Sequence, residues 1–163
     1  MPEKEILISI SKKSRKLGIV ILTESRVIYY NQNWLVNKRK SAEETAAEIT
    51  EKLIDAYKPV CLVMERLTFK QQQRTQSFIK ARQKIFEVAK RHRLAIKEYS
   101  LQEARASFCP GVKVTKNSVA RILVFQYPEF ARFRPEKPGW QIDHYQPLFN
   151  ALALGFHFLK DVK

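Results

Sequence analysis

The sequence predicts an α/β fold in which a mixed sheet of five strands, the first three antiparallel, carries helices on both faces. Three short β-prone runs separated by short polar turns fill the first 34 residues, and after them helical apolar spacing alternates with short apolar runs. The chain has 163 residues, 45% of them hydrophobic, and no internal repeat. We therefore expect a single domain over residues 1–163.

The first three strands are expected at residues 5–11, 17–23 and 26–34. Each run is short and rich in Ile, Leu, Val or Tyr, which favour strands. The polar residues 12–16 (KKSRK) predict a turn between the first two strands. Because connections this short cannot cross over a sheet, the three strands should form an antiparallel meander.

Helical spacing begins after the third strand, over residues 41–57. Ser41 and Glu44 form a capping box, and the helix should end before Pro59, because the residue before a proline disfavours helical geometry. Residues 59–65 (PVCLVME) are an almost uninterrupted apolar run. Such a run is typical of a central strand that is buried on both faces.

The remaining elements continue this alternation. We expect a helix over residues 72–92, a strand over 94–99, a helix capped by Ser100 and Glu103, a helix over 115–125, a loop over 127–140, and a last helix from about Asp143 to Lys160.

The charge of the chain indicates its kind of partner. Lys and Arg number 30 against 16 Asp and Glu, a formal net charge of +14, and residues 61–140 hold 17 basic and 6 acidic residues. This concentration favours a polyanion, most commonly nucleic acid, although an acidic membrane surface or a solubilising role would also account for it. The sequence has no membrane-length apolar stretch and no signal peptide, which predicts a cytoplasmic protein without a membrane partner.

The composition excludes several common catalytic sites. The four glycines are too dispersed for a nucleotide-binding P-loop or a dinucleotide fingerprint. The three histidines do not stand at zinc-binding spacing with the two cysteines, and no G-x-S-x-G motif is present.

Two places along the chain could carry chemistry. Glu65 closes the buried strand at its carboxyl end, where open α/β sheets place ligands, although a solvated carboxylate paired with Arg66 is the simpler alternative. Asp143, His144 and Asn150 lie at the start of the last helix. Asp143 could serve only as the N-cap, and His144, kept neutral by the helix N-terminus, could be a metal ligand or an ordinary surface residue.

Across most of the chain, an ordered set of segments resembles a known family. The segments are ILISISKKSRKLGIVIL, CLVMERLTF, VTKNSVARILV and FNALALGFHF. They are similar to the first hairpin, the strand that ends in the catalytic glutamate, the Lys-Ser-x-Val helix and the closing Asp-Ala-x-Ala helix of the RuvC-type Holliday junction resolvases. The resemblance implies an RNase H-like (RuvC-like) fold, nuclease ancestry and a role in DNA recombination.

Members of that family use four acidic positions to hold two Mg²⁺ ions. The resemblance puts Ser11 at the first position, Glu65 at the second, and either Pro147 with Asn150 or His144 with Pro147 at the last two. Two divalent cations about 4 Å apart need several carboxylates to offset their repulsion. With one carboxylate clearly kept, the sequence predicts poor Mg²⁺ binding.

Residues that the resemblance assigns to nucleic-acid binding are better kept. Lys116 matches a helical lysine that faces phosphate, and Phe69 matches an aromatic residue that can stack on bases. The other residues expected to bind nucleic acid are Lys12, Lys13, Lys70, Arg74, Lys80, Arg82, Lys84, Arg132 and Arg134.

The resemblance also implies a possible homodimer packed through the helix over residues 72–92. The apolar residues on that helix favour burial against the sheet over a dimer interface; they are Phe78, Ile79, Ile85 and Phe86.

Three functions stay open. The first is a RuvC-like protein that binds branched or structured DNA with little or no nuclease activity. The second is an active structure-selective endonuclease with a rearranged site, in which Glu65 and Asp143 hold Mg²⁺ or Mn²⁺ and His144 assists. The third is a protein-interaction component whose charge serves solubility. The basic central region and the missing carboxylate at Ser11 favour the first, and the candidate catalytic residues are Ser11, Glu65, Asp143, His144 and Asn150.

Overall fold

The computed structural model describes residues 5–13, 15–36, 39–66, 76–108, 115–133 and 144–161, except the side chains of Lys116 and Asn117. Five strands form one sheet in the order β3-β2-β1-β4-β5. Their bounds are Leu7–Lys13 (β1), Lys16–Leu22 (β2), Val27–Trp34 (β3), Cys61–Glu65 (β4) and Ala95–Tyr99 (β5). The first three are antiparallel, and β4 and β5 run parallel to β1, which confirms the predicted mixed sheet.

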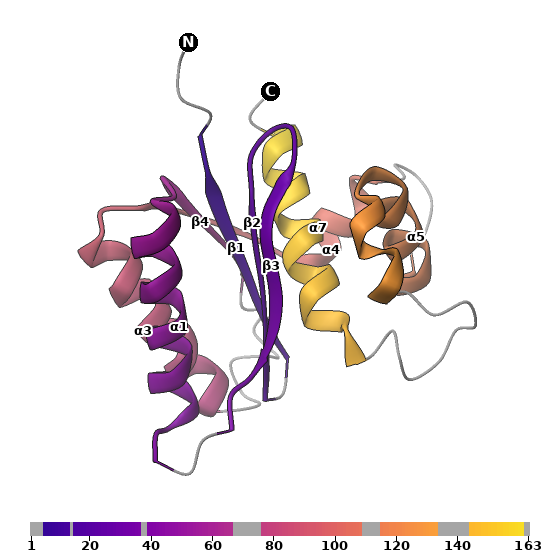
Figure 1. Ribbon diagram of the computed structural model, residues 1–163. Helices are drawn as coiled ribbons and strands as arrows, with labels where there is room; N and C mark the ends of the chain where they lie inside the picture. Colours follow the sequence, from indigo (N-terminus) through magenta and orange to yellow (C-terminus); the bar gives the residue numbers. More distant parts are fainter. Residues whose placement is uncertain are drawn as a thin grey trace.

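Helices cover both faces of this sheet (Figure 1). On one face lie α1 (Ala42–Tyr57) and α3 (Gln76–Arg91). On the other face lie α4 (Leu101–Ala106), α5 (Lys116–Gln126), the 3₁₀ helix η1 (Pro128–Phe133) and α7 (Gln146–Asp161). Among the described residues, no helix is long and apolar enough to cross a membrane. A single domain over residues 1–163 stays a prediction.

The predicted helix caps are present. The Ser41 hydroxyl accepts a hydrogen bond from the Glu44 backbone N–H at 3.2 Å, and the Ser100 hydroxyl accepts one from Glu103 at 2.9 Å. Each bond satisfies a backbone donor that the first turn of a helix would otherwise leave unpaired.

Two segments differ from the sequence prediction. Lys12 and Lys13, expected in a turn, extend β1, because their backbones pair with Leu17 and Lys16 of β2 and tighten the hairpin. Residues 128–133, expected in a loop, form η1. This short helix brings Phe130 into the core, where it contacts Tyr30 and Phe149. Burial of this aromatic ring explains why a proline-led segment becomes ordered.

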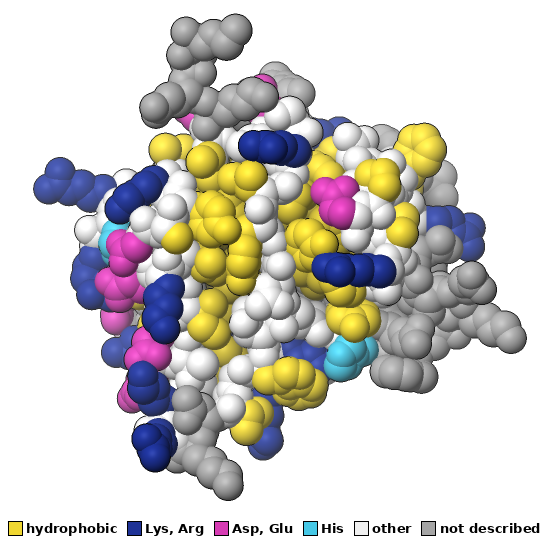
Figure 2. Space-filling view, viewed as in Figure 1, with side chains coloured by type: hydrophobic (Ala, Val, Ile, Leu, Met, Phe, Trp, Pro, Cys, Tyr) yellow, Lys and Arg dark blue, Asp and Glu magenta, His cyan; other side chains and the backbone are white. Residues whose placement is uncertain are grey.

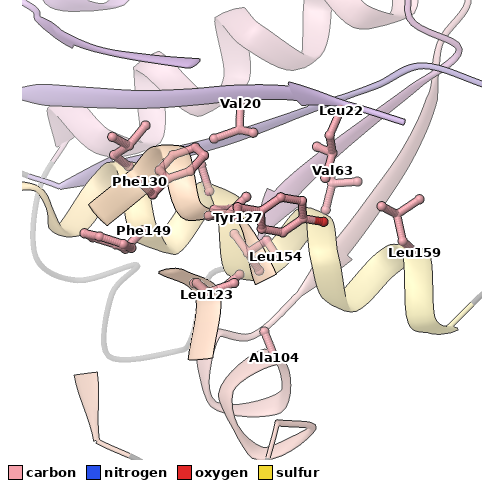
Figure 3. Packing of buried hydrophobic residues seen from close by; sticks show 14 of the residues in the cluster. Val20, Leu22, Val63, Ala104, Leu123, Tyr127, Phe130, Phe149, Leu154 and Leu159 are labelled. Carbon is pink, nitrogen blue, oxygen red and sulfur yellow. The ribbon is translucent and has the colours of Figure 1, made fainter. Parts of the chain in front are cut away.

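Helix α7 is the central element of the second face. It is buried from Gln146 to Gly155 and packs across β1 and β2 (Figure 3). The Ser9 hydroxyl of β1 donates a 2.5 Å hydrogen bond to the carbonyl of Ala151. At Gly18 of β2 the helix comes so close that an added Cβ would lie 2.3 Å from the carbonyl carbon and oxygen of Pro147.

The apolar residues of α3 divide between two environments. Ile85 is fully buried in the core cluster on the α1 and α3 face, and Phe86 packs against that cluster. Phe78 and Ile79, near the start of the helix, are half-buried. A homodimer through α3 stays a prediction.

The close approach at Gly18 yields a stability prediction. Gly18→Ala should lower the free energy of unfolding by about 3 kcal/mol, because the new methyl group meets helix backbone that cannot move aside. The comparison is Gly155→Ala, whose methyl would meet the flexible Leu22 side chain at 3.0 Å and whose alanine favours the helix, so its loss should be smaller. Urea unfolding measures both. Equal midpoints for Gly18→Ala and the unchanged protein would contradict the close contact.

Candidate functional site

The candidate site lies where β1 and β4 end. Glu65 is the last residue of β4 and only 6% exposed. Ile10 of β1 pairs with Met64, so continuing the parallel register puts Ser11 beside Glu65. Ser11 is 1% exposed, and its hydroxyl has no hydrogen-bond partner within the described part of the chain. A buried carboxylate thus stands at the carboxyl end of β4, as predicted, and a buried hydroxyl stands beside it on β1, two residues before that strand ends.

The first turns of α7 supply the next group. Pro147 lies against Gly18, which pairs with Ser11, and Ala151 lies against Ser9. Asn150 is in the same turn of the helix and 5% exposed. Its side-chain oxygen accepts a 2.5 Å hydrogen bond from the Gln146 amide. The structure therefore brings Asn150 to the strand ends that carry Ser11 and Glu65.

Arg105 of α4 completes the site. Its guanidinium donates a 3.0 Å hydrogen bond to the side-chain oxygen of Asn150. Burial lowers the pKa of Arg105, and the nearby Glu65 carboxylate opposes that shift by stabilising the charged guanidinium. A buried carboxylate is costly without a counter-charge, and here Arg105 provides positive charge from the protein itself.

Neither Arg105 nor Gln146 was predicted from the sequence. Arg105 belongs to a short capped helix whose sequence, LQEARA, carries no motif. Its role depends on α4 packing against α7, 45 residues further along the chain. Gln146 lies one turn before Asn150, and a pattern of residues four apart on α7 could have pointed to it.

These residues do not fit a pair of Mg²⁺ ions. Two hydrogen bonds already occupy the Asn150 oxygen, Ser11 offers a neutral hydroxyl, and Arg105 adds a positive charge that would repel a cation. Among the described residues there is no group of three or more His, Cys, Asp or Glu that could hold a metal ion. Asp143, predicted as a metal ligand, lies outside the described residues.

His144 lies away from Glu65. The Lys16 ammonium is 3.2 Å from His144 Nδ1 and donates a 3.1 Å hydrogen bond to its carbonyl. The same carbonyl accepts a 2.6 Å hydrogen bond from Gln32 of β3. These contacts hold His144 over β2 and β3, whereas Glu65 is on β4, on the other side of β1. In this arrangement His144 does not form a set with Glu65, and of the two alignments Pro147 with Asn150 is the one that faces the strand ends.

Lys12 and Lys13 point to opposite faces of the sheet. Ile8 and Ile10 belong to the core under α1 and α3, and the alternation of the strand puts Lys12 on that face. There it is buried, its ammonium 5.6 Å from the centre of the Phe78 ring, and burial lowers its pKa. Lys13 is exposed and on the α7 face, beside Lys16. Of the two, Lys13 has the exposure that a phosphate contact requires.

The basic residues predicted on α3 are not alike. Arg82 is mostly buried: it forms an ion pair with Glu98, donates a 3.3 Å hydrogen bond to the Glu65 carbonyl, and lies over the Phe86 ring. These contacts give Arg82 a structural role at the end of β4. Lys80 and Lys84 are exposed and one turn apart, so they share a face of the helix.

Several predicted residues lie elsewhere. Arg132 of η1 is exposed and donates a 2.7 Å hydrogen bond to the Tyr30 hydroxyl. Lys116 begins α5, but its side chain is outside the described part. The other predicted residues outside it are Phe69, Lys70, Arg74 and Arg134.

Comparison with known proteins identifies the fold. No family model and no curated protein sequence matches this chain. Among solved structures, Thermus thermophilus RuvC covers 96% of this chain and 96% of its own, with a TM-score of 0.70 and 12% identity. The chain has the RuvC fold. The same bacterium's RuvC in complex with a Holliday junction substrate gives a TM-score of 0.71 at 13% identity, with 97% and 95% coverage. The yeast mitochondrial Holliday junction resolvase Ydc2 gives 0.60 at 10% identity, with 98% and 85% coverage.

Within the RuvC fold, this chain has its own set of residues at the ends of β1 and β4. The family resemblance implied acidic residues where Ser11 and Asn150 stand, and neither side chain carries a charge. Glu65 keeps its carboxylate, with Arg105 as its described counter-charge.

Replacing Arg105 tests this arrangement. Arg105→Met should lower the free energy of unfolding by about 2 kcal/mol, because Glu65 loses positive charge nearby and Asn150 loses a hydrogen bond. Arg66→Met is the matched control, since Arg66 pairs with Glu103 on the surface and should cost about 0.5 kcal/mol or less. Denaturant unfolding measures both changes.

A double variant isolates the charge interaction. In the double variant Glu65→Gln with Arg105→Met, the free energy of unfolding should fall by about 1 kcal/mol less than the sum of the decreases in the two single variants. The reason is that neither charge is left without the other. Strict additivity would contradict an electrostatic interaction between Glu65 and Arg105.

Proposed function

We propose that this protein binds branched or structured DNA and has little or no nuclease activity. The observation that carries the proposal is a RuvC fold in which Ser11, Asn150 and Arg105 lie around Glu65, whose carboxylate is the only buried one in the part of the chain that the structure describes. A two-metal hydrolysis needs several carboxylates at this place, and the described donors supply one. The fold and the basic surface support binding, whereas the replaced donors speak against cleavage.

The charge distribution supports a polyanionic ligand. The net charge is +14, and exposed basic residues lie on elements next to the end of β4. Arg82 of α3 donates a hydrogen bond to the Glu65 carbonyl, which puts that turn of α3 beside the site, and Lys80 and Lys84 are exposed in the same part of the helix. On the other side, Lys13 ends β1. Lysines in such positions contact phosphates without reading base sequence.

The deciding experiment is a combined binding and cleavage assay on a labelled four-way DNA junction, with an unlabelled linear duplex as competitor, in Mg²⁺ and then in Mn²⁺. We expect a junction complex that survives the competitor, and no cleaved product in either metal. Symmetric, metal-dependent nicking of the junction would contradict the proposed lack of nuclease activity. Failure to retain the junction at about 0.1 M salt would overturn the binding function.

Charge reversal on α3 tests where the junction is bound. Lys80→Glu with Lys84→Glu should weaken junction binding at least about tenfold and lower the slope of log affinity against log salt by about two, because two phosphate contacts are lost. The matched control is Lys52→Glu with Lys90→Glu, which makes the same change of charge at exposed positions on α1 and at the far end of α3. Gel-shift titrations at several salt concentrations measure both. Equal losses of junction affinity in the two double variants would exclude a local phosphate contact at Lys80 and Lys84.

A further inference from the structure

A row of aromatic side chains follows the edge of the sheet where β3 meets the start of α7. Neighbouring rings lie within 6.3 Å of each other, centre to centre: Trp34 with His144, His144 with Tyr145, Tyr145 with Phe133, and Phe133 with Tyr30. We call these five residues the β3 aromatic strip. Two of them come from β3 and three from segments more than 90 residues further along the chain, so the strip exists only in the folded protein.

A cation stands at each end of the β3 aromatic strip. The Lys16 ammonium lies 5.1 Å from the centre of the Trp34 ring, and the Arg132 guanidinium lies 5.3 Å from that of Tyr30 and 4.7 Å from that of Phe133. None of these side chains is acidic. In Figure 2, which looks onto the β3 edge, hydrophobic side chains, a basic side chain and a histidine gather at the lower end of the sheet.

Trp34 is the exposed member of the strip. It is 58% exposed, whereas the other four rings are half-buried. A large apolar side chain in water gains by covering its ring, and β3 is the edge strand, with no further strand beside it in the described sheet. The ring is also held in place, since Lys16 contacts both Trp34 and His144.

The strip is continuous with the candidate site. Lys13 pairs with Lys16, and Lys16 pairs with Trp34, so these three side chains stand in one row across β1, β2 and β3. The next row inward holds Ser11, Gly18 and Gln32. Three strand spacings separate Glu65 from Trp34, about 15 Å, a distance that a few nucleotides can span.

We propose that the β3 aromatic strip, with Lys16 and Arg132, binds unpaired nucleotides that leave the Glu65 site along the β3 edge. Aromatic rings stack on base faces, which are available only where a strand is unpaired, and cations at both ends of the row match the phosphates. This inference rests on the proposed nucleic-acid function and adds to it a second surface and a class of ligand.

The test uses fluorescence anisotropy of a labelled oligothymidylate of about 16 nucleotides, with a blunt-ended four-way junction measured in parallel. Trp34→Ala should weaken oligothymidylate binding about tenfold, whereas Trp34→Phe, which keeps a ring, should stay within about threefold. Phe125→Ala is the control, because Phe125 is 89% exposed on α5, outside the strip, and its removal should leave oligothymidylate affinity unchanged. Junction binding should fall less than oligothymidylate binding in Trp34→Ala.

A second readout observes the ring itself. In a Trp140→Phe background, Trp34 is the only tryptophan, and its fluorescence should be quenched when the unlabelled oligothymidylate is added. This measurement does not depend on how well any Trp34 variant folds.

The outcomes separate the two proposals. If the unchanged protein binds neither the junction nor the oligothymidylate, both proposals are overturned. The proposal for the strip is overturned if the unchanged protein binds the junction but not the oligothymidylate. It is also overturned if Trp34→Ala binds the oligothymidylate as tightly as the unchanged protein does. In both cases the proposed junction binding stands. Equal losses of oligothymidylate affinity in Trp34→Ala and Trp34→Phe would also overturn the proposal for the strip, because stacking on the ring would then not be the source of binding.

Discussion

The close approach of α7 to the sheet at Gly18 is the constraint on which the rest of the structure depends. Pro147 occupies the space that a side chain at position 18 would fill, and this contact fixes where the helix begins along β1 and β2. Because the start is fixed, Asn150 stands at the ends of β1 and β4, and His144 stands over β2 and β3. The contact at this one glycine thus decides which residue of α7 reaches the candidate site and where the aromatic strip lies.

The chemistry of the site follows from how its negative charge is balanced. A carboxylate at the end of a buried strand needs a counter-charge, which can be a metal ion or a basic side chain. In this chain Arg105 supplies positive charge near Glu65. Asn150, which accepts a hydrogen bond from Arg105, has no charge of its own. A guanidinium stabilises the folded protein but cannot activate water as a metal ion does. The arrangement is therefore suited to stabilising the site in the folded protein.

Local sequence signals predicted most of the elements. Strand and helix periods, the caps at Ser41 and Ser100, and the buried run that ends in Glu65 were all confirmed. The prediction was wrong where tertiary pairing overrides local composition. The lysines at 12 and 13 were expected in a turn and extend β1, because β2 offers their backbones hydrogen-bond partners, and residues 128–133 form η1 because Phe130 is buried.

By itself, the sequence determined the order of strands and helices, the position of Glu65 at a strand end, and the absence of charge at Ser11 and Asn150. These depend on residue type and on spacing along the chain. The partner of each side chain was decided only by the tertiary structure. Arg105 meets Asn150 across 45 residues and Lys16 meets His144 across 128. Periodicity and capping act within a few residues, whereas such contacts depend on which helix packs against which strand, and at what distance.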